Sequence, residues 1–148
     1  MRRLALTCFL LSASFVPANA GGPSVPGRFP QIDYGFKQLR GRGLAAALST
    51  WTYESRLANQ TGLAEKAKAF AAIEKKLGDC TGYQIVEVIP LGGGSSTVFA
   101  SAQYWNGTIF FRFLHFSSNV QETVNDVTWS LDPFEVWPDT IVARLRAQ

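Results

Sequence analysis

The segment that decides the fold is TVFASAQYWNGTIFFRFLHFS, residues 97–117. Its two halves, Thr97–Trp105 and Thr108–Ser117, are rich in β-branched and aromatic residues, which favour strands. Asn106 and Gly107 separate the halves, and both tolerate the positive φ angles that a tight hairpin turn requires. The segment therefore predicts two antiparallel strands joined at residues 106–107.

Two further strands are predicted on either side of this hairpin. Tyr83–Leu91 is an alternating run whose two faces are both largely apolar, and the glycine-rich stretch Gly92–Ser96 turns the chain after it. Asp126–Phe134 alternates apolar and polar residues, and Pro133 either ends this strand or confines it to a sheet edge. The sequence thus predicts a four-stranded antiparallel meander.

Two helices are predicted before the strands. The first has apolar residues at three- and four-residue spacing and is expected to end near Ala58. The second runs to Gly78, a residue that ends helices readily because it adopts the left-handed conformation without steric cost. The apolar stripes are Leu44, Ala47, Leu48 and Trp51 in the first helix, and Leu63, Ala67, Phe70, Ile73 and Leu77 in the second. The expected fold is α+β, with two N-terminal helices packed on a curved four-stranded antiparallel sheet that forms a cone or roll.

The first twenty residues have the layout of a secretory signal peptide. Arg2 and Arg3 precede the apolar run Leu4–Val16, and Ala18 and Ala20 frame a cleavage site. The run is too short for a stable membrane-spanning helix, and no membrane span is predicted. We expect cleavage near Ala20 and export to the periplasm or the medium.

The rest of the chain divides into three parts by composition. Residues 21–38 begin with a stretch rich in proline and glycine and are expected to form a flexible lead-in. Residues 39–138 form the α+β domain, and residues 139–148 form a short basic tail with enough apolar residues for one or two amphipathic turns.

Charge and cysteine content exclude several function classes. Removal of Arg2 and Arg3 lowers the number of Lys and Arg residues from 14 to 12 against 11 Asp and Glu, which leaves a net charge of about +1. A nearly neutral chain without a basic stripe is not expected to bind nucleic acid. With one histidine and only Cys80 outside the leader, neither a metal site nor a bound cofactor is predicted.

Several motifs resemble those of small exported proteins of the nuclear transport factor 2-like (cystatin-like cone) superfamily. They are Thr81-Gly82-Tyr83, the strand Ile109–Phe113 with its single arginine, and Trp129 before Asp132-Pro133-Phe134, and the resemblance covers roughly residues 40–138. It implies a sheet curved around a helix, with a cone mouth that in some members binds a small molecule. A minority of that superfamily are isomerases or dehydratases, but their carboxylate–tyrosine and His–Asp patterns do not match residues here.

The third predicted strand supplies the main site candidates. Ile109, Phe111, Phe113 and His115 share one face, whereas Arg112 lies on the other face between aromatic residues. Buried among them, Arg112 would need either a structural pair with Glu87 or an anionic ligand. His115 is the only histidine and therefore the candidate general base, with an ordinary hydrogen-bonded histidine as the alternative. The candidate ligand-binding residues are Arg112, Glu87, Trp51, Phe111 and Phe113, and the alternative for the aromatic residues is a place in the core.

Three functions follow from these observations. The first is an exported non-enzymatic domain that binds a small apolar or weakly acidic molecule, or a partner protein. The second is an isomerase- or hydrolase-like enzyme that uses His115 with a nearby carboxylate. The third is a structural envelope protein that forms a homodimer through its open sheet face.

Overall fold

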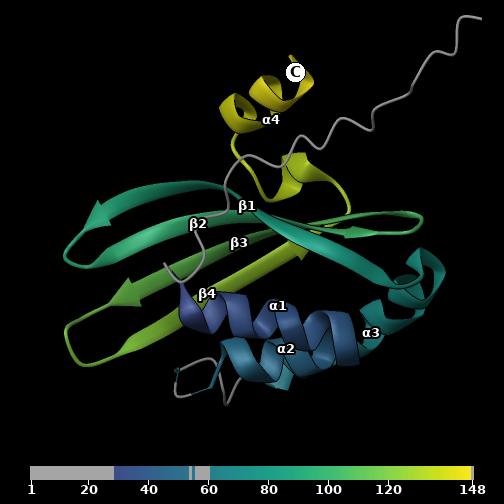
Figure 1. Ribbon diagram of the computed structural model, residues 1–148, viewed down its shortest axis with the longest axis horizontal. Coiled ribbons are helices and arrows are strands. Elements are labelled where there is room, and N and C mark those ends of the chain that lie inside the picture. The colour runs from purple at the N-terminus through teal and green to yellow at the C-terminus, as the bar shows by residue number, and fades with distance from the viewer. Residues whose placement is uncertain (1–28, 54, 56–60, 148) are drawn as a thin grey trace, which may run out of the picture.

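The computed structural model describes residues 29–53, 55 and 61–147, so the predicted signal peptide lies outside the described residues (Figure 1). The fold is α+β and contains an antiparallel sheet with strand order β1-β2-β3-β4. The strands are β1 (Cys80–Gly92), β2 (Ser95–Tyr104), β3 (Gly107–Ser117) and β4 (Glu122–Ser130). The predicted four-stranded meander is confirmed, because each strand pairs with its neighbour in sequence.

The central hairpin turns one residue earlier than the sequence predicts. Tyr104 pairs with Gly107, so Trp105 and Asn106 form the two-residue turn. At the other end of β2, Gly94 has a φ of 79°, and a Cβ atom there would lie 2.2 Å from the carbonyl oxygen of Ser117. Glycine at this position therefore lets the β1–β2 turn approach the end of β3 closely.

The helices differ from the prediction at the N-terminal side. Helix α1 (Pro30–Arg42) occupies much of the segment expected to be a flexible lead-in. Proline is well suited to the first helical turn, and the helix buries Ile32, Phe36 and Leu39 along one face. Burial of that face outweighs the unfavourable local composition, so the folded domain begins before residue 39.

Two more helices complete this layer. Helix α2 (Leu44–Trp51) is shorter than predicted, because the chain already turns at Thr52, and α3 (Thr61–Leu77) ends just before Gly78 as expected. The α1–α2 pair lies against one face of the sheet (Figure 1). Phe36, Trp51, Phe111 and Phe113 meet in this core, and all four are fully buried.

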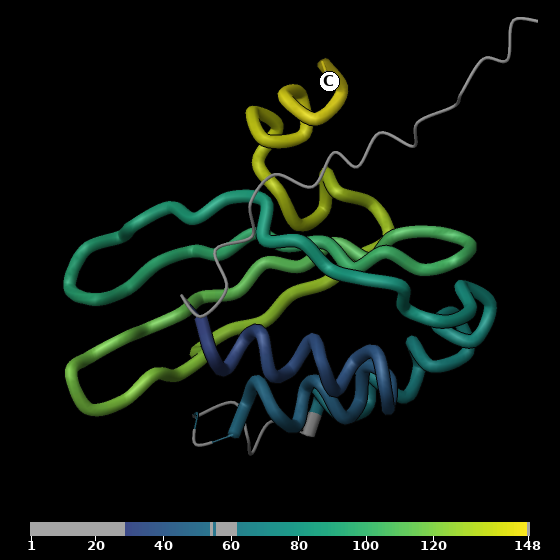
Figure 2. The backbone as a smooth tube through the Cα atoms, in the orientation of Figure 1, coloured from purple at the N-terminus to yellow at the C-terminus, as the bar shows by residue number. Residues whose placement is uncertain are grey.

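The predicted basic tail forms helix α4 (Asp139–Arg146), which follows the short 3-10 helix η2 (Pro133–Glu135). This C-terminal segment lies on the opposite side of the sheet from α1 and α2, as the chain path shows (Figure 2). A second core cluster forms there from Phe99, Val136, Trp137, Ile141 and Val142. The Nε1 of Trp137 donates a hydrogen bond of 2.9 Å to the carbonyl oxygen of Phe111, so both sheet faces are covered near their centre.

Within the described part of the chain, every helix is too short or too polar to cross a lipid bilayer.

Candidate ligand-binding groove

The aromatic candidates from the sequence lie in the core. Trp51, Phe111 and Phe113 each have no exposed surface, and their rings pack edge-on or stacked with centroids 4.9–5.8 Å apart. The indole Nε1 of Trp51 donates to the carbonyl oxygen of Ile32 at 3.0 Å. These side chains therefore hold α1 and α2 against β3.

The predicted pair between Arg112 and Glu87 does not form. Arg112 bonds the hydroxyl of Thr128 at 3.2 Å and lies 3.7 Å from the Asp126 carboxylate, whereas Glu87 pairs with Arg144 of α4. In the sheet register, Phe99 of β2 stands between Glu87 and Arg112. Two strand spacings, about 10 Å, separate the two backbones, so the expected pairing is wrong.

The arginine is also not buried as the sequence suggested. Its side chain is 44% exposed on the outer sheet face, where its charge stays in contact with water. An exposed guanidinium does not require a ligand anion, so the physical reason for assigning Arg112 to an anion site is absent.

His115 is buried at the end of β3 and lies between three elements. The Phe29 ring covers its imidazole edge-on at a centroid distance of 4.9 Å, and Nδ1 is 3.5 Å from the Ser96 hydroxyl of β2. The other nitrogen, Nε2, has no hydrogen-bond partner among the described residues and lies 4.0 Å from the Glu122 carboxylate at the start of β4. Ser96, His115 and Glu122 thus form a row across the inner sheet face.

Burial moves the two titratable members of this row toward their uncharged forms. Desolvation lowers the pKa of His115 from its ordinary 6.5 and raises the pKa of Glu122 from its ordinary 4.5. Both contacts in the row are at or beyond ordinary hydrogen-bond distance, and His115 is only 2% exposed. The imidazole is therefore screened from a reacting molecule in this conformation.

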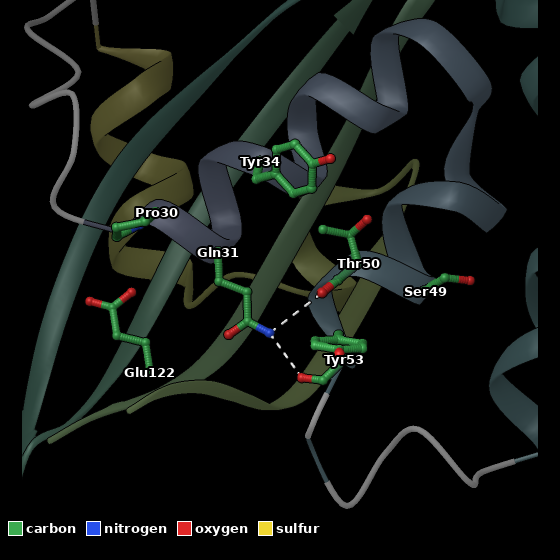
Figure 3. Close-up of a pocket in the computed structure, with 7 residues that line it drawn as sticks. All are labelled: Pro30, Gln31, Tyr34, Ser49, Thr50, Tyr53 and Glu122. Atoms are coloured by element: carbon green, nitrogen blue, oxygen red, sulfur yellow. Dashed lines mark hydrogen bonds between the residues drawn. The ribbon is translucent and has the colours of Figure 1, made fainter. Parts of the chain in front are cut away.

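Glu122 also lines an open groove of about 490 Å³ between α1 and α2 (Figure 3). Tyr34 of α1 and Tyr53 beyond α2 give it aromatic surface, and both tyrosines are more than half exposed. The described lining residues are Pro30, Gln31, Tyr34, Ser49, Thr50, Tyr53 and Glu122. The groove brings together the start of α1, the end of α2 and the start of β4.

Gln31 connects the two helices at the bottom of this groove. Its Nε2 lies within hydrogen-bond distance of the backbone carbonyl oxygens of Thr50, Trp51 and Tyr53, at 3.4, 2.9 and 3.3 Å. Its Oε1 is buried and has no hydrogen-bond partner in the described part of the chain. The groove is therefore lined by an amide that the backbone of α2 holds in place.

A second, more polar pocket of about 320 Å³ lies near the C-terminal ends of α1 and α3. Arg40, Arg42 and Lys75 line it together with acidic residues. One of these, Glu74, accepts hydrogen bonds from the Leu44 backbone N–H at 3.0 and 3.1 Å. This carboxylate caps α2 from α3, and the basic side chains lie at helix C-termini, where cations are favourable. The charged residues of this pocket are thus explained by their favourable positions at the ends of helices, without a ligand.

The sequence interpretation missed Gln31, Tyr34 and Glu122. Two of them lie in the segment assigned to the lead-in, although Pro30 followed by apolar residues at positions 32, 36 and 39 is a recognisable helix start. No comparable local signal marked Glu122, which gains its place only through the β3–β4 pairing.

Among the residues the structure describes, no group of three or more His, Cys, Asp or Glu side chains could hold a metal ion. Comparison of the chain with protein-family models, curated proteins and solved structures finds no match. The functional interpretation therefore rests on the groove itself.

Proposed function

We propose that this protein is an exported, non-enzymatic binding protein that takes a small molecule with an apolar body into the groove between α1 and α2. The observation that carries the proposal is the groove itself, with about 490 Å³ of space beside two exposed tyrosine rings. Sites for small molecules are typically of this size, with aromatic walls and a few fixed polar groups. Export is proposed from the signal-like residues 1–20.

The groove has fixed walls on the helical side. Gln31 ties α1 to the end of α2, and Trp51 inserts beneath them with its indole bonded to Ile32. A site on packed helices loses little conformational freedom when a ligand enters, which favours binding. In this proposal the predicted core residues Trp51, Phe111 and Phe113 support the groove from below and do not touch the ligand.

The uncharged fluorescent probe N-phenyl-1-naphthylamine tests the groove. We expect saturable fluorescence enhancement with the wild-type protein and its loss in Ser49→Trp, because the new indole fills the space beside Tyr53. Ala72→Trp places the same side chain on exposed α3 and is the matched control. Equal enhancement by Ser49→Trp and wild type would place the probe elsewhere, and no enhancement by the wild type would refute the proposal.

An isomerase- or hydrolase-like enzyme using His115 is the second candidate. The row Ser96–His115–Glu122 favours it, whereas the burial of the imidazole under Phe29 disfavours it. Hydrolysis of p-nitrophenyl acetate by wild type and His115→Asn separates the two candidates. The binding proposal expects equal background rates, and a rate that depends on His115 would support the enzyme.

The nuclear transport factor 2-like cone and the homodimer stay predictions. The uncovered part of the outer sheet face includes Ile89 and Leu91, which are 37% and 57% exposed. Such a surface is compatible with an envelope protein that dimerises. Light scattering during size-exclusion chromatography measures the oligomeric state directly.

A further inference from the structure

Three of the polar side chains that line the groove already use their protons in hydrogen bonds to the backbone. The Ser49 hydroxyl donates to the Ala45 carbonyl oxygen and the Thr50 hydroxyl donates to that of Ala46, both at 3.1 Å. A hydroxyl whose proton is used in this way offers only lone pairs to a ligand. The amide N–H bonds of Gln31 are likewise directed at backbone carbonyl oxygens.

Apart from the phenolic hydroxyls of Tyr34 and Tyr53, the side-chain groups that remain in the described lining are acceptors. Gln31 Oε1 is buried without a partner among the described residues, and a buried acceptor left unpaired costs about 1–3 kcal/mol. In Figure 3 this oxygen lies on the side of the amide nearer Glu122, away from the hydrogen bonds of Nε2. The negative end of this amide dipole therefore adds to the charge of Glu122 on the same side of the groove.

Glu122 adds a negative charge to the same groove. None of the seven described lining residues is a lysine or an arginine, so the charge that these residues give the groove is negative. Its side chain is 31% exposed, which leaves it accessible to a ligand. The faces of the Tyr34 and Tyr53 rings are also electron-rich and attract cations.

From this inventory we propose that the ligand is a small organic cation, an ammonium head group on an aromatic or aliphatic body. This inference rests on the proposed function and specifies its ligand class. The ammonium donates to Glu122, the amide dipole of Gln31 adds to the attraction, and the body lies along the tyrosine rings. A weakly acidic ligand, as the sequence suggested, would bring a second negative charge beside Glu122, because Arg112 lies on the outer sheet face.

Three probes with one phenyl body test the ligand class by isothermal titration calorimetry at pH 7.5. They are 2-phenylethylamine, which is a cation, 2-phenylethanol, which is neutral, and 3-phenylpropionate, which is an anion. We expect the amine to bind about tenfold more tightly than the alcohol, as a charge-assisted hydrogen bond allows, and the acid to bind least. Glu122→Gln should reduce the affinity for the amine to that for the alcohol. Glu65→Gln, an exposed carboxylate on α3, should leave it unchanged.

The outcomes separate this inference from the proposed function. If the alcohol or the acid binds at least as tightly as the amine, the inferred preference for a cation is wrong, while the proposal that the groove binds a small molecule stands. If Glu122→Gln retains its fold by circular dichroism and binds the amine as the wild type does, the carboxylate is not the recognition group and the inference is overturned. If none of the three probes binds and N-phenyl-1-naphthylamine also fails, both proposals are refuted.

Discussion

The Nε2 atom of His115 lies 4.0 Å from the Oε2 atom of Glu122. One side of this contact is a buried imidazole, and the other is a carboxylate that lines the groove. A proton on His115 and a cation in the groove therefore interact with the same negative charge. Binding of either one should weaken binding of the other by the same factor.

The pKa of His115 should report on Glu122. Burial holds this pKa below 6.5, and the nearby carboxylate acts in the opposite direction because it favours the protonated imidazole. We expect Glu122→Gln to lower the pKa further, and saturating 2-phenylethylamine to lower it in the wild type. His115 is the only histidine, so a one-dimensional NMR titration of its Hε1 proton measures the effect. An identical pKa in wild type and Glu122→Gln would contradict the coupling.

The same buried histidine should make folding sensitive to acid. Above about pH 6.5 both folded and unfolded states hold His115 neutral, and below it the unfolded state takes up the proton first. The free energy of unfolding should therefore fall as pH decreases from 6.5 through the lowered folded-state pKa. Glu122 has the opposite effect on the free energy of unfolding. Because its pKa is raised in the folded state, the stability that it contributes is lost as pH rises through that folded-state pKa. Urea unfolding of the wild type and of His115→Phe at each pH gives the contribution of the histidine as the difference between their free energies of unfolding, because both proteins contain Glu122.

Gly35 should tolerate no side chain. A Cβ atom there would lie 1.9 Å from Nε1 of the buried Trp51, whereas a Cβ at Gly41 in the same helix meets nothing within 4 Å. We expect Gly35→Ala to lower the free energy of unfolding by about 2 kcal/mol or more through overpacking. Gly41→Ala, the matched control, should raise it by about 0.5–1 kcal/mol because alanine favours the helix. Urea unfolding followed by tryptophan fluorescence measures both, and equal effects would contradict the close contact.

Trp137 should hold the C-terminal segment on the sheet. It is buried among Phe99, Ile141 and Val142, and its indole bonds the Phe111 carbonyl oxygen. Trp137→Ala should cost about 3–5 kcal/mol, as expected for a large buried aromatic residue. The same substitution at Trp105, which is 73% exposed in the β2–β3 turn, should change stability by less than about 0.5 kcal/mol. Thermal unfolding compares the two variants, and similar losses would contradict the docking of α4.

Export should yield a mature protein that begins at Gly21. Ala18 and Ala20 provide the small side chains that signal peptidases require, and Asn19 between them is less restricted. We expect Ala20→Leu to block cleavage and Asn19→Gln to leave it intact. Intact-mass measurement of the exported protein distinguishes the two, and a full-length wild-type protein would refute the predicted cleavage.

Local sequence signals predicted the number and order of the strands well and the first helix poorly. The bounds of the fourth strand were also wrong, because β4 runs from Glu122 to Ser130 instead of from Asp126 to Phe134. The hairpin was predictable because Asn106-Gly107 separates two strongly β-forming runs, and only the exact turn residues shifted by one. Helix α1 was missed because proline and glycine dominate the residues before it, whereas its stability comes from burial of Ile32, Phe36 and Leu39. Such burial depends on the sheet that the helix packs against.

The ion pairs and the groove could not be predicted from the sequence, because they also depend on how distant segments pack together. Glu87 and Arg112 looked complementary, but the strand register places Phe99 between them and brings Arg144 to Glu87 from α4. Register and helix docking are set by the packing of the whole domain, so charge complementarity between two strands does not identify partners.

The sequence by itself determined the order of the strands and the division of β3 into two faces, with Ile109, Phe111, Phe113 and His115 on the same one. The division into faces follows because successive side chains of an extended chain point to opposite sides, and this alternation can be seen in each short segment alone. Only the tertiary structure brought Gln31, Tyr53 and Glu122 around one groove. These residues lie in three separate segments, and the contacts that bring them together exist only after helices and sheet have buried their apolar faces against each other.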